Sequence, residues 1–139
     1  MKRDDEKLLN ILLFLKDRCA AAEDKIRESL GLTAAEYKGL MGLQMGEKIS
    51  CQELSSRMNL SVSRGSRVIE NLFQKGFISR ADCTSDRRSK NIWLTKKGMR
   101  LRQKINGLTQ DCEDRLIADI PETRLNRFKA DLKTLIQNF

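Results

Sequence analysis

The segment SCQELSSRMNLSVSRGSRVIENLFQKGFISR, residues 50–80, decides the fold of this chain. It opens with a capping-box pattern at Ser50–Glu53, which predicts the start of a short helix. Ser61 predicts the start of a second helix, and Gly76 predicts its end, because glycine is common just past a helix C-terminus. Two short helices joined by about three residues are typical of a helix-turn-helix.

The second of these helices is predicted to have two contrasting sides. On a helical wheel, the predicted core-facing side holds Val62, Gly65, Ser66, Ile69, Leu72 and Phe73. The opposite, polar side holds Ser63, Arg64, Arg67, Asn71 and Gln74. Arginine pairs with guanine, and asparagine or glutamine with adenine, in the major groove. A merely solvated face usually mixes Glu with Lys, so this polar side predicts contacts with bases and phosphates.

The residues after this helix predict a hairpin. Residues 77–81 and 91–94 have the composition of strands, and the polar residues 82–91 between them predict a loop that carries Arg87 and Arg88. A hairpin with a basic tip directly after a helix-turn-helix is a wing, which can place arginine in a narrow minor groove. The alternative is a flexible exposed turn.

The two ends of the chain predict long helices. Apolar residues recur every three or four positions over residues 5–30, and the first two turns of that helix are apolar almost all round. Thr33 predicts the start of the next helix, and Thr95 that of a long helix reaching about residue 120. Pro121 suits the first turn of a last amphipathic helix. Apolar terminal helices of this kind favour a homodimer, in which a partner chain covers them.

Charge is concentrated in the middle of the chain. The 139 residues carry a formal net charge of +8. Residues 46–104 hold 14 basic and five acidic residues, a net charge of +9, so the remainder is nearly neutral. A basic surface of this kind predicts a nucleic-acid partner. The chain has no histidine, and no catalytic pair or phosphate-binding loop is recognisable. We therefore expect neither an enzyme nor a cofactor or metal.

The sequence also predicts the cellular compartment and the state of the cysteines. No secretory signal and no stretch of about 20 apolar residues is present, which predicts a cytoplasmic protein with no membrane partner. The four cysteines lack zinc-finger spacing, and we expect them to be small buried residues; they are Cys19, Cys51, Cys83 and Cys112. Oxidant sensing by these thiols is the alternative.

The combination of motifs resembles the MarR family of winged helix-turn-helix transcription regulators. The resemblance lies in LT at 32–33 with EY at 36–37, IS at 49–50 with EL at 53–54, LSVS at 60–63, RVIENL at 67–72, KGFISR at 75–80, DRR at 86–88 and LTKKG at 94–98. The D-x-R motif followed by L-T-x-x-G, at this distance from G-x-I-x-R, is the most specific part. The resemblance as a whole covers most of the chain.

The resemblance implies a mainly α-helical fold with a winged-helix region at 33–98 and dimerisation helices at 1–31 and 99–139. It implies a homodimer that represses a palindromic operator in double-stranded DNA and is released by a small-molecule effector, whose binding residues the sequence does not identify. By position, the DNA-binding residues are Ser61, Ser63, Arg64, Arg67, Asn71 and, in the wing, Arg87 or Arg88. Asp86 is similar to an acid that holds the wing arginine, which makes Arg88 the braced residue.

Two residues depart from the family pattern. Gly65 stands where an apolar residue is usual and predicts a looser recognition helix, because glycine destabilises a helix interior. Arg64 replaces a small hydroxyl residue, so the operator sequence cannot be carried over. Two other functions remain open, a thiol-switch regulator and a helical module that binds another protein through its terminal helices.

Overall fold

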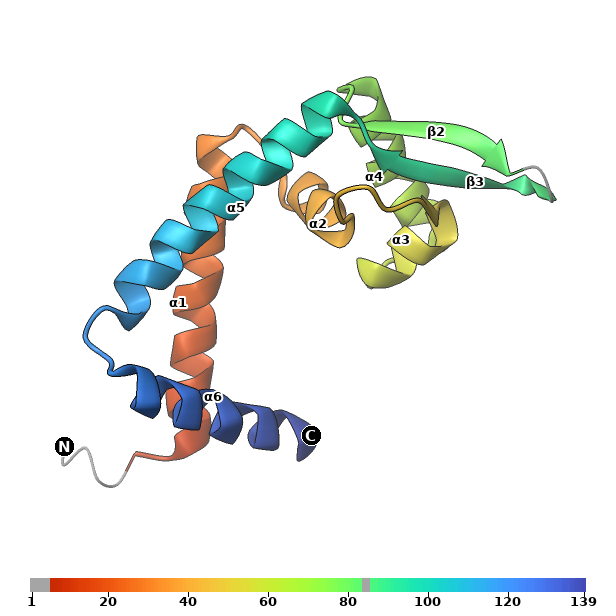
Figure 1. Cartoon of the computed structure of the whole chain (residues 1–139). Coiled ribbons are helices and arrows are strands. Elements are labelled where there is room, and N and C mark those ends of the chain that lie inside the picture. The colour runs from red at the N-terminus through yellow and green to blue at the C-terminus, as the bar shows by residue number, and fades with distance from the viewer. Residues whose placement is uncertain (1–5, 84–85) are drawn as a thin grey trace. The chain divides into compact units, whose positions relative to one another are not determined.

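The computed structural model describes residues 6–83 and 86–139, and the side chains of residues 82–90 lie outside the described part. The chain divides into two compact units, Met1–Asn106 and Gly107–Phe139. Its helices are α1 (Leu8–Ser29), α2 (Ala34–Gly42), α3 (Cys51–Arg57), α4 (Val62–Gln74), α5 (Lys96–Ile117) and α6 (Glu122–Gln137). Its strands are β1 (Ile49–Ser50), β2 (Ile78–Cys83) and β3 (Asp86–Leu94). The fold is mainly α-helical with a small sheet, as predicted (Figure 1).

The predicted helix starts are confirmed by their capping hydrogen bonds. The Oγ1 of Thr33 accepts a hydrogen bond from the Glu36 amide at 3.1 Å, and the Oγ of Ser50 accepts one from the Glu53 amide at 3.0 Å. Ser61 caps α4 in the same way. Each bond satisfies an amide that a helix leaves unpaired at its first turn.

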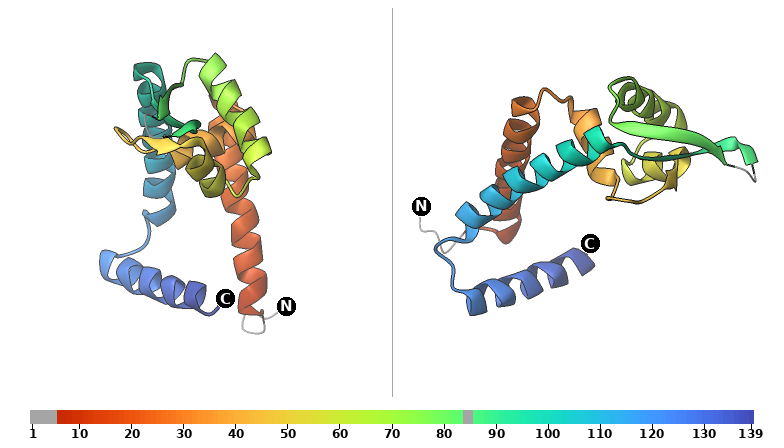
Figure 2. Two further views of the ribbon diagram at one scale, coloured as in Figure 1. Left: turned by 90° about the vertical axis from the view of Figure 1, so that its right-hand side faces the viewer. Right: turned by 45° about the horizontal axis from the view of Figure 1, so that its top comes forward.

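The sheet has the strand order β1-β3-β2 and is antiparallel. β1, which the sequence analysis missed, has only two residues and is too short to show an alternating pattern. The expectation of a loop over residues 82–91 is wrong for most of that range, because β3 begins at Asp86 and Ala81 pairs with Asn91. Backbone pairing forms the ladder there despite the polar side chains. The β2–β3 hairpin projects beyond α3 and α4 (Figures 1 and 2).

One hydrophobic core lies within the first unit. Its fully covered side chains come from α2, α3, α4, the sheet and the first part of α5, and they include Leu40, Leu54, Leu72, Ile92 and Ile105. From α1, only Ile26 and the following Leu30 pack against this core. The core therefore holds the helix-turn-helix to the base of the hairpin.

The start of α5 explains the L-T-x-x-G motif. The Oγ1 of Thr95 accepts a hydrogen bond from the Gly98 amide at 3.1 Å and donates one to the Gly76 carbonyl at 2.6 Å. A Cβ on Gly98 would lie 1.9 Å from the Phe77 carbonyl oxygen. Only glycine fits so close to another backbone segment, so the motif joins α5 to the end of α4.

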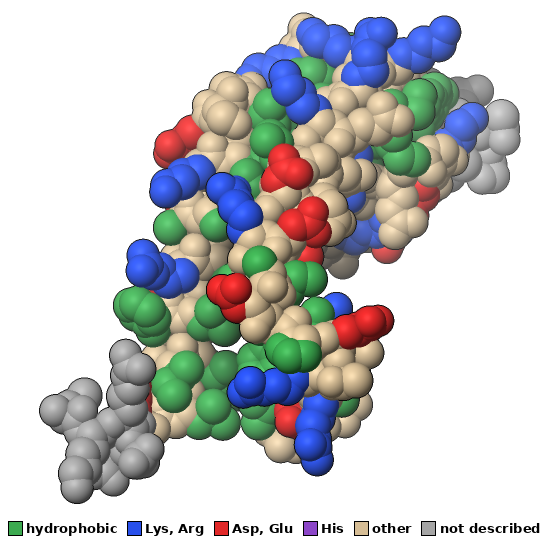
Figure 3. Space-filling view, turned by 60° about the vertical axis from the view of Figure 1, so that its left-hand side comes forward, with side chains coloured by type: hydrophobic (Ala, Val, Ile, Leu, Met, Phe, Trp, Pro, Cys, Tyr) green, Lys and Arg blue, Asp and Glu red, His purple; other side chains and the backbone are tan. Residues whose placement is uncertain are grey.

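The terminal helices keep much apolar surface uncovered. Neither α1 nor α6 contains a buried residue. The exposed apolar side chains on α1 are Leu8, Leu9, Ile11, Leu13, Phe14 and Leu15, and those at the C-terminal end are Phe128, Ile136 and Phe139. Hydrophobic side chains also lie open on the surface in Figure 3. Pro121 is the residue before α6 rather than part of its first turn.

Candidate DNA-binding surface

Close packing of α4 on α3 sets the position of the predicted recognition helix. Gly65 is buried, and a Cβ built on it would lie 2.5 Å from the Cβ of Ser55 and 1.9 Å from its Oγ. Ser55 is itself 1% exposed, and its Oγ donates a hydrogen bond to the Cys51 carbonyl at 2.8 Å. Gly65 therefore allows the two helices to touch, and the expectation that it merely loosens α4 is replaced by this packing role.

The outward face of α4 carries the predicted polar residues. Ser63, Arg64, Arg67 and Asn71 are all exposed. Within the described part of the chain, the side chains of Arg64, Arg67 and Asn71 make no hydrogen bond or ion pair. The Oγ of Ser61 is engaged, since it accepts a hydrogen bond from the Arg64 amide at 3.3 Å and lies 3.3 Å from the Ser63 Oγ. Two arginines and an asparagine are thus left available for a ligand.

The predicted apolar side of α4 is confirmed at Gly65, Ile69 and Leu72, but it is wrong at Val62 and Ser66 and omits Val68. The buried residues are Gly65, Val68, Ile69 and Leu72, whereas Val62 is 57% exposed and Ser66 is exposed. The first turn of α4 extends beyond the cover of α3, which a helical wheel cannot show. Val62 was therefore missed as a surface residue, although its position between Ser61 and Ser63 was a signal.

Three side chains tie α4 to the wing. The guanidinium of Arg80 on β2 pairs with the Glu70 carboxylate at 2.5 Å and lies over the Phe73 ring, with its Cζ 4.0 Å from the ring centroid. Glu70 also accepts a hydrogen bond from the Gln74 amide group at 2.9 Å. This cluster fixes the direction in which the hairpin leaves the recognition helix. The sequence showed the charges, but their pairing depends on the turn between α4 and β2.

The wing residues Asp86, Arg87 and Arg88 have their backbone in β3. Their side chains lie outside the described residues, so their predicted roles stay predictions.

Arg57 is a basic residue that the fold has already engaged. Its guanidinium pairs with Glu47 at 2.7 Å and Glu53 at 3.3 Å, and it donates to the Gly42 carbonyl at 2.9 Å. The hydrogen bond from Arg57, together with the Gln44 amide, lowers the pKa of the Glu47 carboxyl. The same bond raises the pKa of Arg57. This network joins the end of α2 to α3 and leaves Arg57 unsuited to bind DNA.

Comparison with known proteins identifies this arrangement. The family model described as "MarR family" matches residues 32–90, which span α2, the helix-turn-helix and most of the hairpin. This part of the chain matches the MarR family. The match supports a DNA-binding transcriptional regulator.

Characterised relatives of this chain are distant in sequence. It is 29% identical over 97 residues to the HTH-type transcriptional regulator BilQ of Clostridium symbiosum, covering 68% of this chain and 65% of BilQ. It is 21% identical over 131 residues to the transcriptional repressor MprA of Escherichia coli, covering 93% of this chain and 74% of MprA.

Solved structures agree on the fold. A mutant of MepR from S. aureus superposes with a TM-score of 0.81 at 19% identity, covering 96% of this chain and 98% of that one. Wild-type MarR from E. coli superposes with a TM-score of 0.77 at 20% sequence identity. The superposition covers 94% of this chain and 96% of that one.

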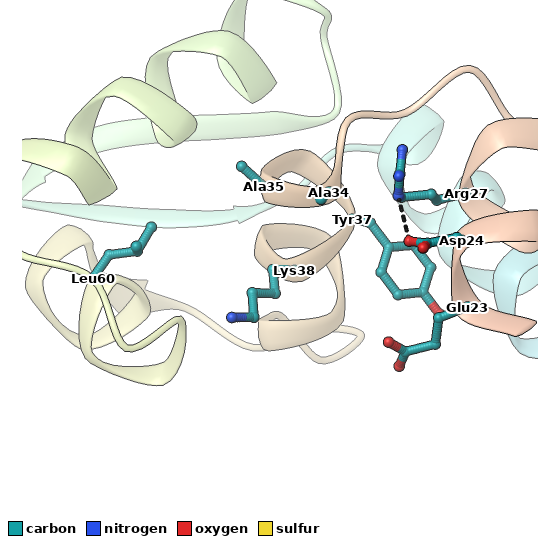
Figure 4. A pocket seen from close by; sticks show the side chains of 8 residues that line it. All are labelled: Glu23, Asp24, Arg27, Ala34, Ala35, Tyr37, Lys38 and Leu60. Carbon is teal, nitrogen blue, oxygen red and sulfur yellow. Dashed lines mark hydrogen bonds and ion pairs between the residues drawn. The ribbon is translucent and has the colours of Figure 1, made fainter. Parts of the chain in front are cut away.

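A cavity of about 310 Å³ opens beside α2 (Figure 4). It is lined by Glu23, Asp24, Arg27, Ala34, Ala35, Tyr37, Lys38 and Leu60. Asp24 accepts a hydrogen bond from Arg27 at 3.1 Å. Burial raises the pKa of the Tyr37 hydroxyl, and Glu23 raises it further, whereas Arg102 acts in the opposite direction. The cavity thus combines a neutral phenol with two acidic and two basic side chains.

The cysteine expectation is not met in the described residues. Cys19 is exposed, and Cys51 and Cys112 are half-buried, while the side chain of Cys83 lies outside the described part. Cys19 remains open because α1 buries no residue. No helix among the described residues is long and apolar enough to cross a membrane.

Proposed function

We propose that the protein is a homodimeric repressor that binds a palindromic operator and is released by a small-molecule effector. The observation that carries the proposal is the outward face of α4, on which Arg64, Arg67 and Asn71 are exposed and make no side-chain bond within the described part of the chain. Arginine with no acidic partner is available for bidentate bonds to guanine, and asparagine for adenine. Such a regulator acts in the cytoplasm, on chromosomal DNA.

The first turn of α4 supports recognition at the base edges. Recognition helices place their N-terminal residues against the bases. Val62, exposed between Ser61 and Ser63, offers an apolar contact to a thymine methyl group. Arg87 and Arg88 are proposed to bind DNA from the wing, with Asp86 bracing Arg88.

Dimerisation is supported by the uncovered apolar side chains of α1 and α6. Six large apolar residues within the first turns of α1 are exposed, which is unusual for a monomer. A second copy covers such a surface in a two-fold dimer. The two α4 helices then read half-sites about one turn of DNA apart, roughly 34–36 Å. The regions 1–31 and 99–139 are accordingly proposed as the dimerisation helices.

Effector release is supported by the cavity beside α2. Its volume of about 310 Å³ suits a small molecule. It is lined by Tyr37 and Lys38 of α2 and by Leu60, which lies one residue before the cap of α4. An effector in this cavity contacts both the helix that carries Glu36 and the turn that precedes α4.

The test begins by selecting a duplex from a random-sequence pool with the wild-type protein. Arg67→Ala is then compared with Arg124→Ala, a control of equal charge change on α6, by fluorescence anisotropy at several salt concentrations. We expect Arg67→Ala to weaken binding by about 1–3 kcal/mol and to reduce the log–log salt slope by about 1 for each phosphate that Arg67 neutralises. The control, used at a concentration at which sedimentation shows it to be a dimer, should bind as wild type does. The proposal is contradicted if the affinity for the duplex does not change with salt concentration, or if Arg67→Ala binds as tightly as wild type. A monomer that selects no DNA favours the protein-interaction module instead.

A further inference from the structure

The first turns of α5 carry a basic stripe, which we define as Lys96, Arg100 and Lys104. The three side chains are exposed and lie one helical turn apart. They face away from Gly98 and Ile105, the residues that α5 buries. Figure 3 shows Lys and Arg side chains crowded at the top of the view, at the height where α5 begins in Figure 1.

The basic stripe has no acidic partner within the described part of the chain. Two acids of the neighbouring helices are engaged elsewhere, since Glu36 pairs with Lys75 at 2.6 Å and Glu70 pairs with Arg80. Residues 96–110 contain five basic and no acidic residues. All three charges of the stripe therefore face solvent uncompensated.

Helix energetics oppose this placement. Positive side chains are unfavourable at a helix N-terminus, where the backbone amides already present partial positive charge. Like charges at i and i+4 also repel. The first turn of α5 has no acidic residue to offset either effect, and its acids begin only at Asp111. Residues that stand where they reduce local stability are typical of functional sites.

We propose that the basic stripe is a second DNA-backbone surface, which binds phosphates of the duplex flanking the half-site that α4 reads. This inference rests on the proposed DNA-binding function. The stripe extends about 12 Å, at 1.5 Å per helical residue. Phosphates follow each strand of duplex DNA every 3.4 Å or so along its axis. Each cation of the stripe therefore meets a phosphate of its own along one strand.

The position of the stripe assigns it to flanking DNA. The Thr95–Gly76 hydrogen bond and the bond from the Lys97 Nζ to the Lys75 carbonyl, at 2.8 Å, hold the start of α5 at the C-terminal end of α4. That end lies about 18 Å from the groove-reading first turn, because α4 has 13 residues. The major groove is only about 8.5 Å deep. The stripe thus lies too far along α4 to serve the groove segment that the first turn enters.

A phosphate backbone fits the stripe better than an acidic protein does. An α4 helix bound in the groove holds the stripe close to flanking duplex at high effective concentration. An acidic protein would have to arrive from solution. DNA length therefore distinguishes the two partners.

The experiment uses the full chain and the duplex selected by the wild-type protein, prepared as 16-bp and 60-bp fragments with the same central site. The 16-bp fragment reaches about 27 Å on each side of its centre, beyond the half-site centres at about 17 Å but short of the flanking phosphates at about 35 Å. The variant is Lys96→Gln/Arg100→Gln/Lys104→Gln. On the 60-bp duplex we expect its affinity to fall on the order of tenfold and its salt slope to drop by about 2–3 per protomer. On the 16-bp duplex, which ends before these phosphates, we expect less than about a threefold loss of affinity. Its melting temperature should not fall, since the substitutions relieve repulsion.

The matched control is Arg124→Gln/Lys129→Gln/Lys133→Gln, which removes the same charge from exposed positions of α6. Because α6 lies in the proposed dimerisation region, sedimentation first checks that the control is a dimer at the concentration used. The dimeric control should bind both duplexes as wild type does. The inference is overturned if the stripe variant retains wild-type affinity and salt slope on the 60-bp duplex, as it would if the stripe served an acidic protein. Equal losses on both duplexes overturn it too. If the wild type selects no duplex at all, the proposed function itself fails, which is a different result.

Discussion

Replacing Gly65 with alanine tests the packing that positions the recognition helix. The new Cβ would lie 2.5 Å from the Cβ of Ser55 and 3.1 Å from its Cα. Carbon atoms that touch normally lie about 3.5–4.0 Å apart. No rotamer of Ser55 relieves the first overlap, because the backbone fixes the Cβ. The helices α3 and α4 must therefore separate by roughly 1 Å.

The magnitude follows from two opposing effects. Overpacking of this kind costs about 1–3 kcal/mol, whereas glycine-to-alanine substitution in a helix contributes about 0.8–1.0 kcal/mol of stability. We expect Gly65→Ala to lower the free energy of unfolding by up to about 2 kcal/mol. Gly107→Ala is the matched control, since Gly107 lies within α5 and a Cβ added there would meet no atom within 4 Å. It should stabilise by about 0.5–1 kcal/mol.

The assay is urea denaturation at one fixed protein concentration, because dimer stability depends on concentration. Ser55→Gly in the Gly65→Ala background removes the overlap with both the Cβ and the Oγ, and a double-mutant cycle should give a favourable coupling of about 1 kcal/mol or more. Ser55→Ala should restore less, because its Cβ remains. The reasoning is refuted if Gly65→Ala is as stabilising as Gly107→Ala, or if Ser55→Gly restores nothing.

Two further substitutions probe charged contacts. Lys75→Met leaves Glu36, which is 3% exposed, without its ion-pair partner. We therefore expect the free energy of unfolding, measured by urea denaturation, to fall by about 1–3 kcal/mol. Unchanged stability would show that the ion pair is dispensable. Because Arg57 lowers the pKa of Glu47 below its ordinary 4.5, their pair stabilises the fold above pH 4.5 and ceases to do so as the pH falls through the lowered value. Melting temperatures of wild type and Glu47→Gln should thus converge below pH 4.5, and a difference that stays constant from pH 7 to pH 3 would contradict this.

Local signals predicted local structure well. The caps at Thr33, Ser50 and Ser61 were readable because each bond joins residues three apart. The exposure of Val62 was not readable, because it depends on how far the other elements cover the first turn of α4. The two-residue strand β1 has no periodicity to detect.

Contacts between distant residues could not be predicted from the sequence. Glu36 and Lys75 are 39 positions apart, and nothing in either local pattern marks them as partners. The roles of Asp86, Arg87 and Arg88 came only from resemblance to the family, and they stay predictions.

The sequence by itself determined the order of the helices, the hairpin and the concentration of charge between residues 46 and 104, because caps, periodicity and composition are properties of neighbouring residues. Only the tertiary structure decided which cations remain available. Arg57 and Arg80 are engaged by acids from other elements, whereas Arg64 and Arg67 make no side-chain bond within the described part of the chain. The physical reason is that net charge adds up along a chain, but ion pairing requires atoms within a few ångströms, and folding alone brings them there.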